Sequence, residues 1–263
     1  MDKGIIKKMI SNKVYHFKEL ASTNEFAKGI LKEAPEWTVV IADQQKEGKG
    51  RLGKKWYSPP GGLWFSVILK PQNPLIFPLI AGVAVCESMS ELGIRARVKW
   101  PNDILINGKK VAGILTEFVD GNVILGMGIN LNIQEFPEDI KSTATSLFLE
   151  KGKPCDKKKV LNLVLTKIEE KYKLVGRQNF EPLLEEWRSY SVTFGKKILV
   201  NTPTGVLRGE MIDIDLDGAL LLKLPSGNIE KIFAGECTLT QDLNHGLHEG
   251  QRDSSPSLRS GSE

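Results

Sequence analysis

Apolar residues in the first half of the chain occur in short runs, and most of these runs have the length of a β-strand. Runs of four to eight apolar residues bounded by turn residues are typical of strands. The run at residues 63–69 is nearly continuous, which predicts a buried strand. Strands are predicted at residues 14–20, 38–43, 63–69, 94–100, 103–106, 110–118 and 122–130.

Two predicted helices separate these strands. The segment from Ser22 to Glu25 has the Ser-x-x-Glu form of a capping box, which predicts a helix over residues 22–33. Ser22 could serve there as a cap alone, or a ligand could use the N–H groups and hydroxyls of this helix start. An apolar stretch that ends at Gly93, a typical helix-stop residue, predicts a second helix over residues 75–92.

Two tight turns connect the later strands of this half. Asn107-Gly108 and Asp120-Gly121 lie between apolar runs, and such pairs are the strongest short-range signal for a β-hairpin. They predict a mainly antiparallel meander. Its strands contain glycines, which often mark the close approach of a ligand or of another backbone. These are Gly113, Gly126 and Gly128.

The second half of the chain changes pattern twice. Apolar residues at helical spacing predict helices over residues 157–175 and 180–190. From Phe194 onward the runs become short and evenly spaced, which suggests a small β-barrel. Its strands are predicted at residues 197–201, 205–213, 219–224 and 229–233. The predicted division is a large domain at 1–192, the barrel at 193–241 and, from its polar, serine-rich composition, a disordered tail at 242–263.

A glycine-rich basic segment follows the second strand. Three glycines and five basic residues share positions 46–55, and Trp56 comes next. Glycine lets a backbone approach a ligand closely, and clustered N–H groups and cations bind phosphate. A solvated basic loop is the simpler interpretation of most charge runs. The glycines and the tryptophan favour an anion-binding loop here.

Gly48, Gly50 and Gly53 also spell G-x-G-x-x-G, the motif of dinucleotide-binding folds. That motif must open a helix and meet an acidic residue about 20 positions later. Residues 58–62 read Ser-Pro-Pro-Gly-Gly, which cannot continue a helix, and no acid lies in the required window. A Walker A loop also fails, because no Gly-Lys-Ser/Thr follows at the right spacing. The sequence therefore excludes both nucleotide motifs.

Histidine and cysteine usage narrows the chemistry. Of three histidines, His245 and His248 lie in the predicted tail, and His16 is interpreted as an ordinary strand residue. A zinc site or a Ser-His-Asp triad is therefore not expected, and no metal-ligating residue is assigned. The cysteines show no C-x-x-C spacing and are typical of reduced, mostly buried thiols. They are Cys86, Cys155 and Cys237.

Charge and hydropathy limit the partners. A formal net charge of +4 over 263 residues favours local anion binding over the coating of nucleic acid. No window reaches about 18 apolar residues without charge, so no membrane span is predicted. The first residues lead into no apolar run, so no signal peptide is predicted either. We expect a cytoplasmic protein.

Taken together, the motifs resemble those of biotin protein ligases over nearly all of residues 14–240. Each motif is weak alone, but their combination and order are specific. They are Ser22-Thr23-Asn24, Gln45 with Gly48-Lys49-Gly50-Arg51-Leu52-Gly53 and Lys54-Lys55-Trp56, Ser58-Pro59, Lys99-Trp100-Pro101-Asn102-Asp103, Lys110-Val111-Ala112-Gly113-Ile114-Leu115, and Gly126-Met127-Gly128-Ile129-Asn130.

The resemblance implies a fold and a reaction. The fold would be an α/β domain like that of class II aminoacyl-tRNA synthetases, with a mainly antiparallel sheet, followed by a small SH3-like β-barrel. ATP, with Mg²⁺, and biotin would give biotinyl-5′-AMP, and a lysine of a biotin carboxyl carrier protein would then take the biotin. Some members carry a DNA-binding domain before the catalytic one. About 13 residues precede the first strand here, so we expect no DNA binding. Whether the chain forms a homodimer is not predicted by the sequence.

The resemblance also implies roles for residues. The catalytic set would be Lys110, Arg51 and Asp103. The biotin-binding set would be Ser22, Thr23, Asn24, Gln45, Gly48, Lys49, Arg51, Lys110, Gly113 and Leu115. The ATP- and adenylate-binding set would be Gly50, Arg51, Trp56, Asn102, Lys110 and Asn130. Trp100 is expected to pack in the core, and Lys49 and Leu52 stand where some members have arginine.

Two alternatives remain at this point. A lipoate ligase or acyltransferase of the sister family would share a related fold, although the basic glycine-rich loop followed by Lys-Trp favours biotin. A non-catalytic module that binds nucleotide or nucleic acid is the other alternative, and the mild net charge argues against it.

Overall fold

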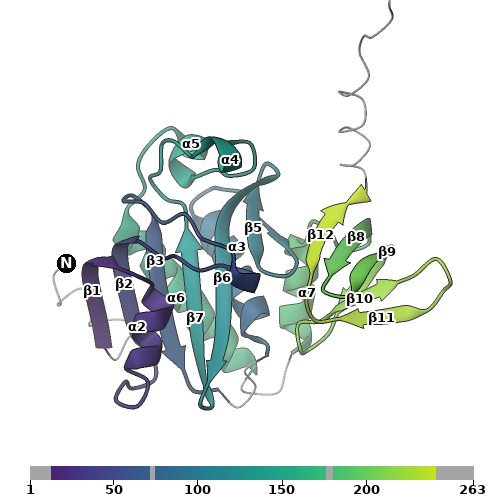
Figure 1. The fold of residues 1–263 in the computed structure, drawn as a ribbon, viewed down its shortest axis with the longest axis horizontal. Helices are drawn as coiled ribbons and strands as arrows, with labels where there is room; N and C mark the ends of the chain where they lie inside the picture. The colour runs from purple at the N-terminus through teal and green to yellow at the C-terminus, as the bar shows by residue number, and fades with distance from the viewer. Residues whose placement is uncertain (1–12, 72–74, 176–179, 241–263) are drawn as a thin grey trace, which may run out of the picture.

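The computed structural model describes residues 13–71, 75–175 and 180–240. The main element of the fold is a seven-stranded sheet with the order β1-β2-β3-β7-β6-β5-β4 (Figure 1). Only β1 and β2 pair in parallel, which confirms a mainly antiparallel sheet. Its strands are β1 Lys13–Leu20, β2 Thr38–Gln45, β3 Leu63–Leu69, β4 Arg97–Lys99, β5 Asp103–Ile106, β6 Lys109–Val119 and β7 Asn122–Ile129. The predicted tail at 242–263 lies outside the described residues.

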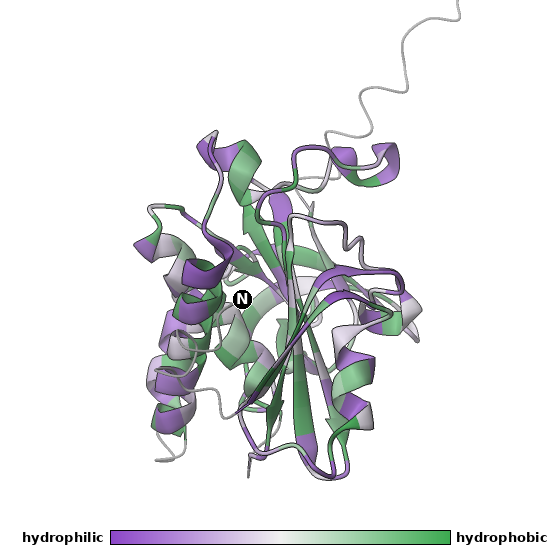
Figure 2. Cartoon of the chain, turned by 90° about the vertical axis from the view of Figure 1, so that its left-hand side faces the viewer, coloured by the Kyte–Doolittle hydropathy of each residue, from purple (hydrophilic) through white to green (hydrophobic). Residues whose placement is uncertain are grey.

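Helices pack on both faces of this sheet. Successive residues of a strand point to opposite faces, and β2 illustrates this, since Val39 and Ile41 join one core and Val40 joins another. The larger core lies under α3 (Phe77–Glu91), behind which α6 (Lys157–Val175) and α7 (Glu181–Tyr190) pack. The smaller core lies under α2 (Thr23–Gly29) on the opposite face. Figures 1 and 2 show the apolar strands enclosed between these layers.

The two predicted hairpin turns are confirmed. Asn107 and Gly108 adopt φ values of 50° and 78°, and Asp120 and Gly121 adopt 48° and 73°. Two successive residues with positive φ form the turn whose twist matches that of the flanking strands. The turns therefore set the register of β5, β6 and β7, the strands that lie closest to the cavity described below.

The C-terminal region forms a second antiparallel sheet of five strands in the order β11-β10-β9-β8-β12. The sequence predicted four of these strands and missed the last. Within the described residues β11 and β12 do not pair with each other, so the region predicted as a small β-barrel is an antiparallel sheet that does not close. The strands are β8 Lys197–Thr202, β9 Gly205–Ile214, β10 Leu220–Lys223, β11 Ile229–Ile232 and β12 Glu236–Leu239.

The second sheet shares a hydrophobic core with the main sheet and its helices. Apolar residues of β8, β9 and β10 belong to the same core as the main sheet. Arg188 of α7 makes a bidentate ion pair with Asp213 of β9, with N–O distances of 2.8 and 3.0 Å. Trp100, which is 1% exposed, donates its indole N–H to the carbonyl of Gly218 at 3.0 Å. The prediction that Trp100 packs in the core is confirmed, and it links the two sheets.

The beginning of α2 differs from the prediction. The helix ends at Gly29 instead of residue 33, and the side chain of Ser22 makes no capping hydrogen bond. Glu25, the other half of the expected capping box, instead bonds to Lys28 and Lys49. The capping box is therefore absent, because neighbouring lysines compete for the Glu25 carboxylate.

Three short elements were not predicted at all. A helix of three to five residues is too short to show an apolar period, so pattern alone cannot find it. These elements are η1 Arg51–Gly53, α4 Glu138–Lys141 and α5 Leu147–Lys151. Among the described residues, no helix combines the length and the apolar character needed to cross a membrane.

Lys171 provides a test of the packing between helices. Its side chain is 7% exposed and forms ion pairs with Glu87 at 2.8 Å and Glu186 at 2.5 Å, which joins α6 to α3 and α7. Replacement by methionine would leave two facing carboxylates without their cation. We expect Lys171→Met to lower the free energy of unfolding by about 3–5 kcal/mol, measured by urea denaturation.

The matched control is Lys173→Met on the same helix, where the lysine is 66% exposed and pairs with Glu169. It should change the free energy of unfolding by less than about 0.5 kcal/mol. Equal effects of the two substitutions would contradict the role assigned to Lys171.

Candidate active site

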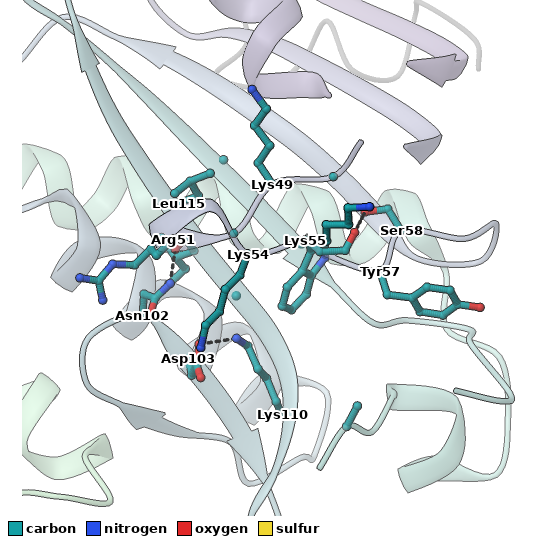
Figure 3. A pocket seen from close by; sticks show the side chains of 18 of the residues that line it. Lys49, Arg51, Lys54, Lys55, Tyr57, Ser58, Asn102, Asp103, Lys110 and Leu115 are labelled. Atoms are coloured by element: carbon teal, nitrogen blue, oxygen red, sulfur yellow. Dashed lines mark hydrogen bonds and ion pairs between the residues drawn. The ribbon is translucent and has the colours of Figure 1, made fainter. Parts of the chain in front are cut away.

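A cavity of about 650 Å³ opens on the α2 side of the main sheet. The glycine-rich loop, β6, β7, the segment around α4 and the edge of β12 surround it (Figure 3). The structure brings every residue assigned from the sequence to this one cavity, while their individual roles stay predictions. These residues are Ser22, Thr23, Asn24, Gln45, Gly48, Lys49, Gly50, Arg51, Trp56, Asn102, Asp103, Lys110, Gly113, Leu115 and Asn130.

The floor of the cavity is made by Trp56 lying on two glycines. A Cβ atom at Gly128 would lie 2.3 Å from the Trp56 indole nitrogen, and one at Gly113 would lie 2.9 Å from its ring. No other residue type fits at these positions without displacement of the indole. The close approach expected at the strand glycines is therefore made by the protein's own side chain, which fixes the end of the glycine-rich loop against the sheet.

Asn24 packs on Gly126, the remaining one of the three strand glycines, in the same way. A Cβ atom at Gly126 would lie 2.2 Å from the Asn24 side-chain oxygen. That oxygen accepts a hydrogen bond from the buried hydroxyl of Ser66 at 2.5 Å, and Ser66 also contacts the Thr23 hydroxyl at 2.7 Å. Gln45 accepts from the Thr23 backbone N–H at 2.8 Å. One end of the cavity is thus a preformed set of polar groups. Ser66 supports this set through its hydrogen bonds to Thr23 and Asn24, and it was not predicted from the sequence.

Lys110 lies at the opposite side of the floor. Its ammonium is 2.6 Å from the Asp103 carboxylate and 4.9 Å from the centre of the Trp56 ring (Figure 3). Its backbone N–H donates to the Thr143 carbonyl at 2.7 Å, and its carbonyl accepts from Thr145 at 2.9 Å. An irregularity in the pairing of β5 with β6 occurs beside it, as β-bulges often do next to active sites. The position of Lys110 is therefore fixed from both sides.

The two asparagines near Lys110 are engaged with the backbone. The Asn102 amide donates to the Ile114 carbonyl at 2.7 Å, which joins the turn before β5 to β6. Asn130 is 4% exposed, and its amide donates to the Thr145 carbonyl at 2.9 Å. Both side chains thus order the segments that carry Lys110. Their contacts with a nucleotide stay a prediction.

Positive charge dominates the cavity. Among the described residues that line it, seven are lysine or arginine and four are carboxylates, and none is histidine. Within those described residues no carboxylate lies in ion-pair distance of Arg51. Burial lowers the pKa of the Arg51 guanidinium, while Asp103 and Glu236 raise it from a distance. Arg51 therefore presents a partly desolvated positive charge without a paired anion, which suits an anionic ligand.

The edge of the second sheet contributes lining residues that the sequence did not identify. Glu236 of β12 forms an ion pair with Lys54 of the glycine-rich loop, and Cys237 beside it is buried, which raises the pKa of its thiol to about 12. Phe136 and Ile140 line the other side. More than 180 positions separate Lys54 from Glu236, so no local pattern could have joined them.

Sequence profiles of two families match the chain. The profile described as the biotin/lipoate A/B protein ligase family matches residues 17–134. The profile of the biotin protein ligase C-terminal domain matches residues 193–239. The second match covers all five strands of the C-terminal sheet.

Whole proteins are similar as well. The bifunctional ligase/repressor BirA of Bacillus subtilis is 39% identical over 240 residues, which cover 86% of this chain and 73% of that protein. The biotin–[acetyl-CoA-carboxylase] ligase of Paracoccus denitrificans is 31% identical, and the matched region covers 79% of this chain and 94% of that protein. A structure of the biotin protein ligase from Aquifex aeolicus in complex with biotin and ATP has a TM-score of 0.78 at 36% identity, covering 87% of this chain and 98% of that one.

The steric account of the floor can be tested at Gly128. An added methyl group would displace the Trp56 indole, so Gly128→Ala should shift tryptophan emission to longer wavelength as the ring becomes solvated. The same substitution in a Trp56→Phe background should produce no such shift. Gly29→Ala is the control, since a Cβ atom there meets nothing within 4 Å. Unchanged emission in Gly128→Ala would show that the indole does not depend on this glycine.

Proposed function

Because the chain belongs to the biotin/lipoate A/B protein ligase family, and within it to the biotin protein ligases, we propose that it activates biotin with ATP and transfers it to a lysine of a biotin carboxyl carrier protein. The C-terminal match and the names of the relatives favour biotin over lipoate and favour an enzyme over a non-catalytic module. The observation that carries the proposal is one cavity of about 650 Å³ with an excess of cations and an unpaired Arg51.

The first step joins two anions. The biotin carboxylate attacks the α-phosphorus of ATP, the bond to the β-phosphate oxygen breaks, and pyrophosphate leaves with the electron pair. Negative charge accumulates around the α-phosphate, so catalysis consists mainly of positioning and charge stabilisation. Lys110 and Arg51 would supply the positive charge at this point. Asp103, 2.6 Å from Lys110, would orient that ammonium.

Biotin would occupy the polar end of the cavity near α2. Its ureido group needs both donors and acceptors, which Ser22, Thr23 and Gln45 present together with the backbone at Gly113 and Leu115. Asn24, Gly48 and Lys49 complete the proposed lining. Because Thr23, Asn24 and Ser66 are already joined by hydrogen bonds, little ordering would remain for the ligand to impose.

ATP would lie between the glycine-rich loop and the segment before α5. Trp56 offers a ring face for the adenine, and Gly50, Asn102 and Asn130 line the same region. Among the described residues no group of three or more His, Cys, Asp or Glu could hold a metal by itself. Mg²⁺ typically binds through phosphates, water and one or two carboxylates, and Asp103 and Glu236 would have to exchange their ion pairs with Lys110 and Lys54 to serve as such ligands. When bound, Mg²⁺ would neutralise phosphate charge.

The second step transfers the biotinyl group. A lysine amine of the carrier attacks the biotinyl carbonyl, an amide bond forms, and AMP leaves with the electron pair of the broken anhydride bond. The amine must lose a proton. Asp103 at the cavity wall is the proposed acceptor, since its carboxylate is 26% exposed and can be reached from the solvent side.

The proposed function predicts ATP–pyrophosphate exchange that depends on biotin. Exchange with lipoate in place of biotin should be absent or far slower. Exchange with lipoate alone would assign the chain to the sister activity, and exchange with neither would contradict the adenylation step.

Lys110 is the sharpest single test of the assignment. We expect Lys110→Ala to lower the rate of biotin-dependent exchange on the order of a hundredfold or more, because a charge that stabilises the transition state is removed. Lys109→Ala is the matched control, since that neighbouring lysine is exposed and does not line the cavity. A folded Lys110→Ala protein with exchange as fast as the control would refute the role of Lys110.

A further inference from the structure

The tip of the glycine-rich loop has few connections to the rest of the molecule. Within the described residues, the backbone hydrogen bonds of positions 48–55 stay inside the loop, as in Gly50 N–H to the Lys54 carbonyl at 2.7 Å. Before the tip, Lys46 and Glu47 donate to the backbone of Leu20 and Ala21. Backbone hydrogen bonds therefore hold the base of the loop against the rest of the protein, whereas the tip is held there by side-chain contacts.

One of these side chains is Lys49. Its ammonium lies 2.9 Å from an oxygen of Glu25 on α2, and the same oxygen accepts from Lys28 at 2.8 Å. Lys28 and then Lys49 lower the pKa of the Glu25 carboxyl, so it is ionised at neutral pH. Lys49 is thus already neutralised by a residue of the protein, in contrast to Arg51.

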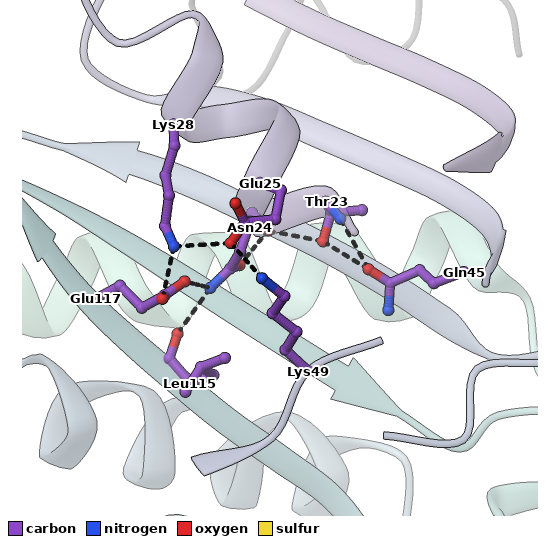
Figure 4. Close-up of polar contacts among 9 residues, drawn as sticks. Thr23, Asn24, Glu25, Lys28, Gln45, Lys49, Leu115 and Glu117 are labelled. Carbon is purple, nitrogen blue, oxygen red and sulfur yellow. Dashed lines mark hydrogen bonds and ion pairs between the residues drawn. The ribbon is translucent and has the colours of Figure 1, made fainter. Parts of the chain in front are cut away.

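The Glu25 carboxylate is connected to the wall of the cavity. Lys28 also contacts Glu117 of β6 at 2.8 Å, and the other oxygen of Glu117 accepts from the Asn24 amide at 2.7 Å (Figure 4). Asn24 lines the cavity and packs on Gly126. A continuous series of charged contacts therefore runs from the loop tip to a side chain at the polar end of the cavity.

We propose that Glu25 is a positioning residue, which latches the tip of the glycine-rich loop over the cavity through Lys49 and is held in place by Lys28 and Glu117. This inference rests on the proposed function, because the latch would retain the reactive biotinyl-adenylate until the carrier lysine arrives. Glu25 itself does not line the cavity. Its effect is exerted on the loop and leaves the reacting atoms untouched.

The size of the effect follows from exposure. The Lys49 and Glu25 side chains are 46% and 40% exposed, so the pair is screened by solvent. Exposed ion pairs change an equilibrium roughly two- to fivefold. A latch of this strength would bias the loop toward the closed position and still release it for the carrier.

The first experiment needs no activity. Trypsin cleavage after Arg51 in the ligand-free protein, followed by mass spectrometry, reports how often the tip opens. Glu25→Gln should raise the cleavage rate roughly two- to fivefold without lowering the melting temperature by more than about 2 °C, because the residue is exposed.

The control is Glu19→Gln, which removes the ion pair with Lys46 and changes the net charge equally. That pair lies at the base of the loop, where backbone hydrogen bonds already fix the chain. Cleavage after Arg51 should therefore stay at the wild-type rate in this variant. Equal rates in the two variants would overturn the latch.

A double-mutant cycle tests the partner. Lys49→Gln alone should raise cleavage about as much as Glu25→Gln, the double variant should add nothing further, and Lys49→Arg should stay at the wild-type rate because the charge is kept. Additive effects of the two single substitutions would show that Glu25 and Lys49 act independently and would contradict the proposal.

The consequence for the reaction is measured as bystander labelling. With ATP and biotin, the biotin found on serum albumin per pyrophosphate released should rise roughly two- to fivefold in Glu25→Gln relative to Glu19→Gln. No rise, with normal pyrophosphate release, would refute retention by Glu25. A wild-type protein without biotin-dependent pyrophosphate release would refute the proposed function, and the proteolysis result would still decide whether the latch exists.

Discussion

The arrangement of the cavity depends on the absence of a side chain at Gly113 and at Gly128, which leaves room for the Trp56 ring. These two glycines of adjacent strands let the Trp56 ring lie flat against the sheet, at distances that a side chain at either position would make impossible. The ring fixes the end of the glycine-rich loop, while backbone hydrogen bonds to Leu20 and Ala21 at the end of β1 fix its beginning. The basic residues between these two points must therefore lie over the same side of the sheet, where the ring also carries the Lys110 ammonium at 4.9 Å.

Charge distribution then determines what the cavity can do. Most of the cations that line it are matched by a nearby carboxylate, as Lys110 is by Asp103 and Lys49 by Glu25. Such pairs fix side chains in position without a large net attraction for anions. Arg51, Lys55 and Lys99 are the exceptions among the described residues, and Arg51 stands out because burial partly desolvates its charge. A site that joins a carboxylate to a phosphate needs both kinds of group: paired lysines in fixed positions and a free guanidinium for the developing charge.

The sequence predicted the fold well wherever the signal was local. The continuous apolar run Leu63–Leu69 and the two turns with glycine at the second position define strands whose bounds match the structure closely. The prediction failed where distant residues compete. The Ser22–Glu25 capping box is absent because Lys28 and Lys49 bind the Glu25 carboxylate, and an isolated motif cannot reveal that competition.

The candidate site shows the same limit. Its motifs could be found from the sequence because the family resemblance supplies their roles, and the structure then places all of them at one cavity. The Glu236 carboxylate and the buried Ser66 hydroxyl could not be found, because each acts through a partner far away in the chain. Closure of the second sheet into a barrel also could not be decided from short strands alone, since the pairing of β11 with β12 depends on curvature, which a one-dimensional pattern does not contain.

The most direct test of the account is transfer to a carrier. Purified protein, ATP and biotin are incubated with a biotin carboxyl carrier domain, and the intact mass and the modified position are determined by mass spectrometry. The account predicts one biotinyl group on one lysine of the carrier, and none when that lysine is replaced by arginine. A carrier that stays unmodified with biotin but accepts lipoate under the same conditions would contradict it.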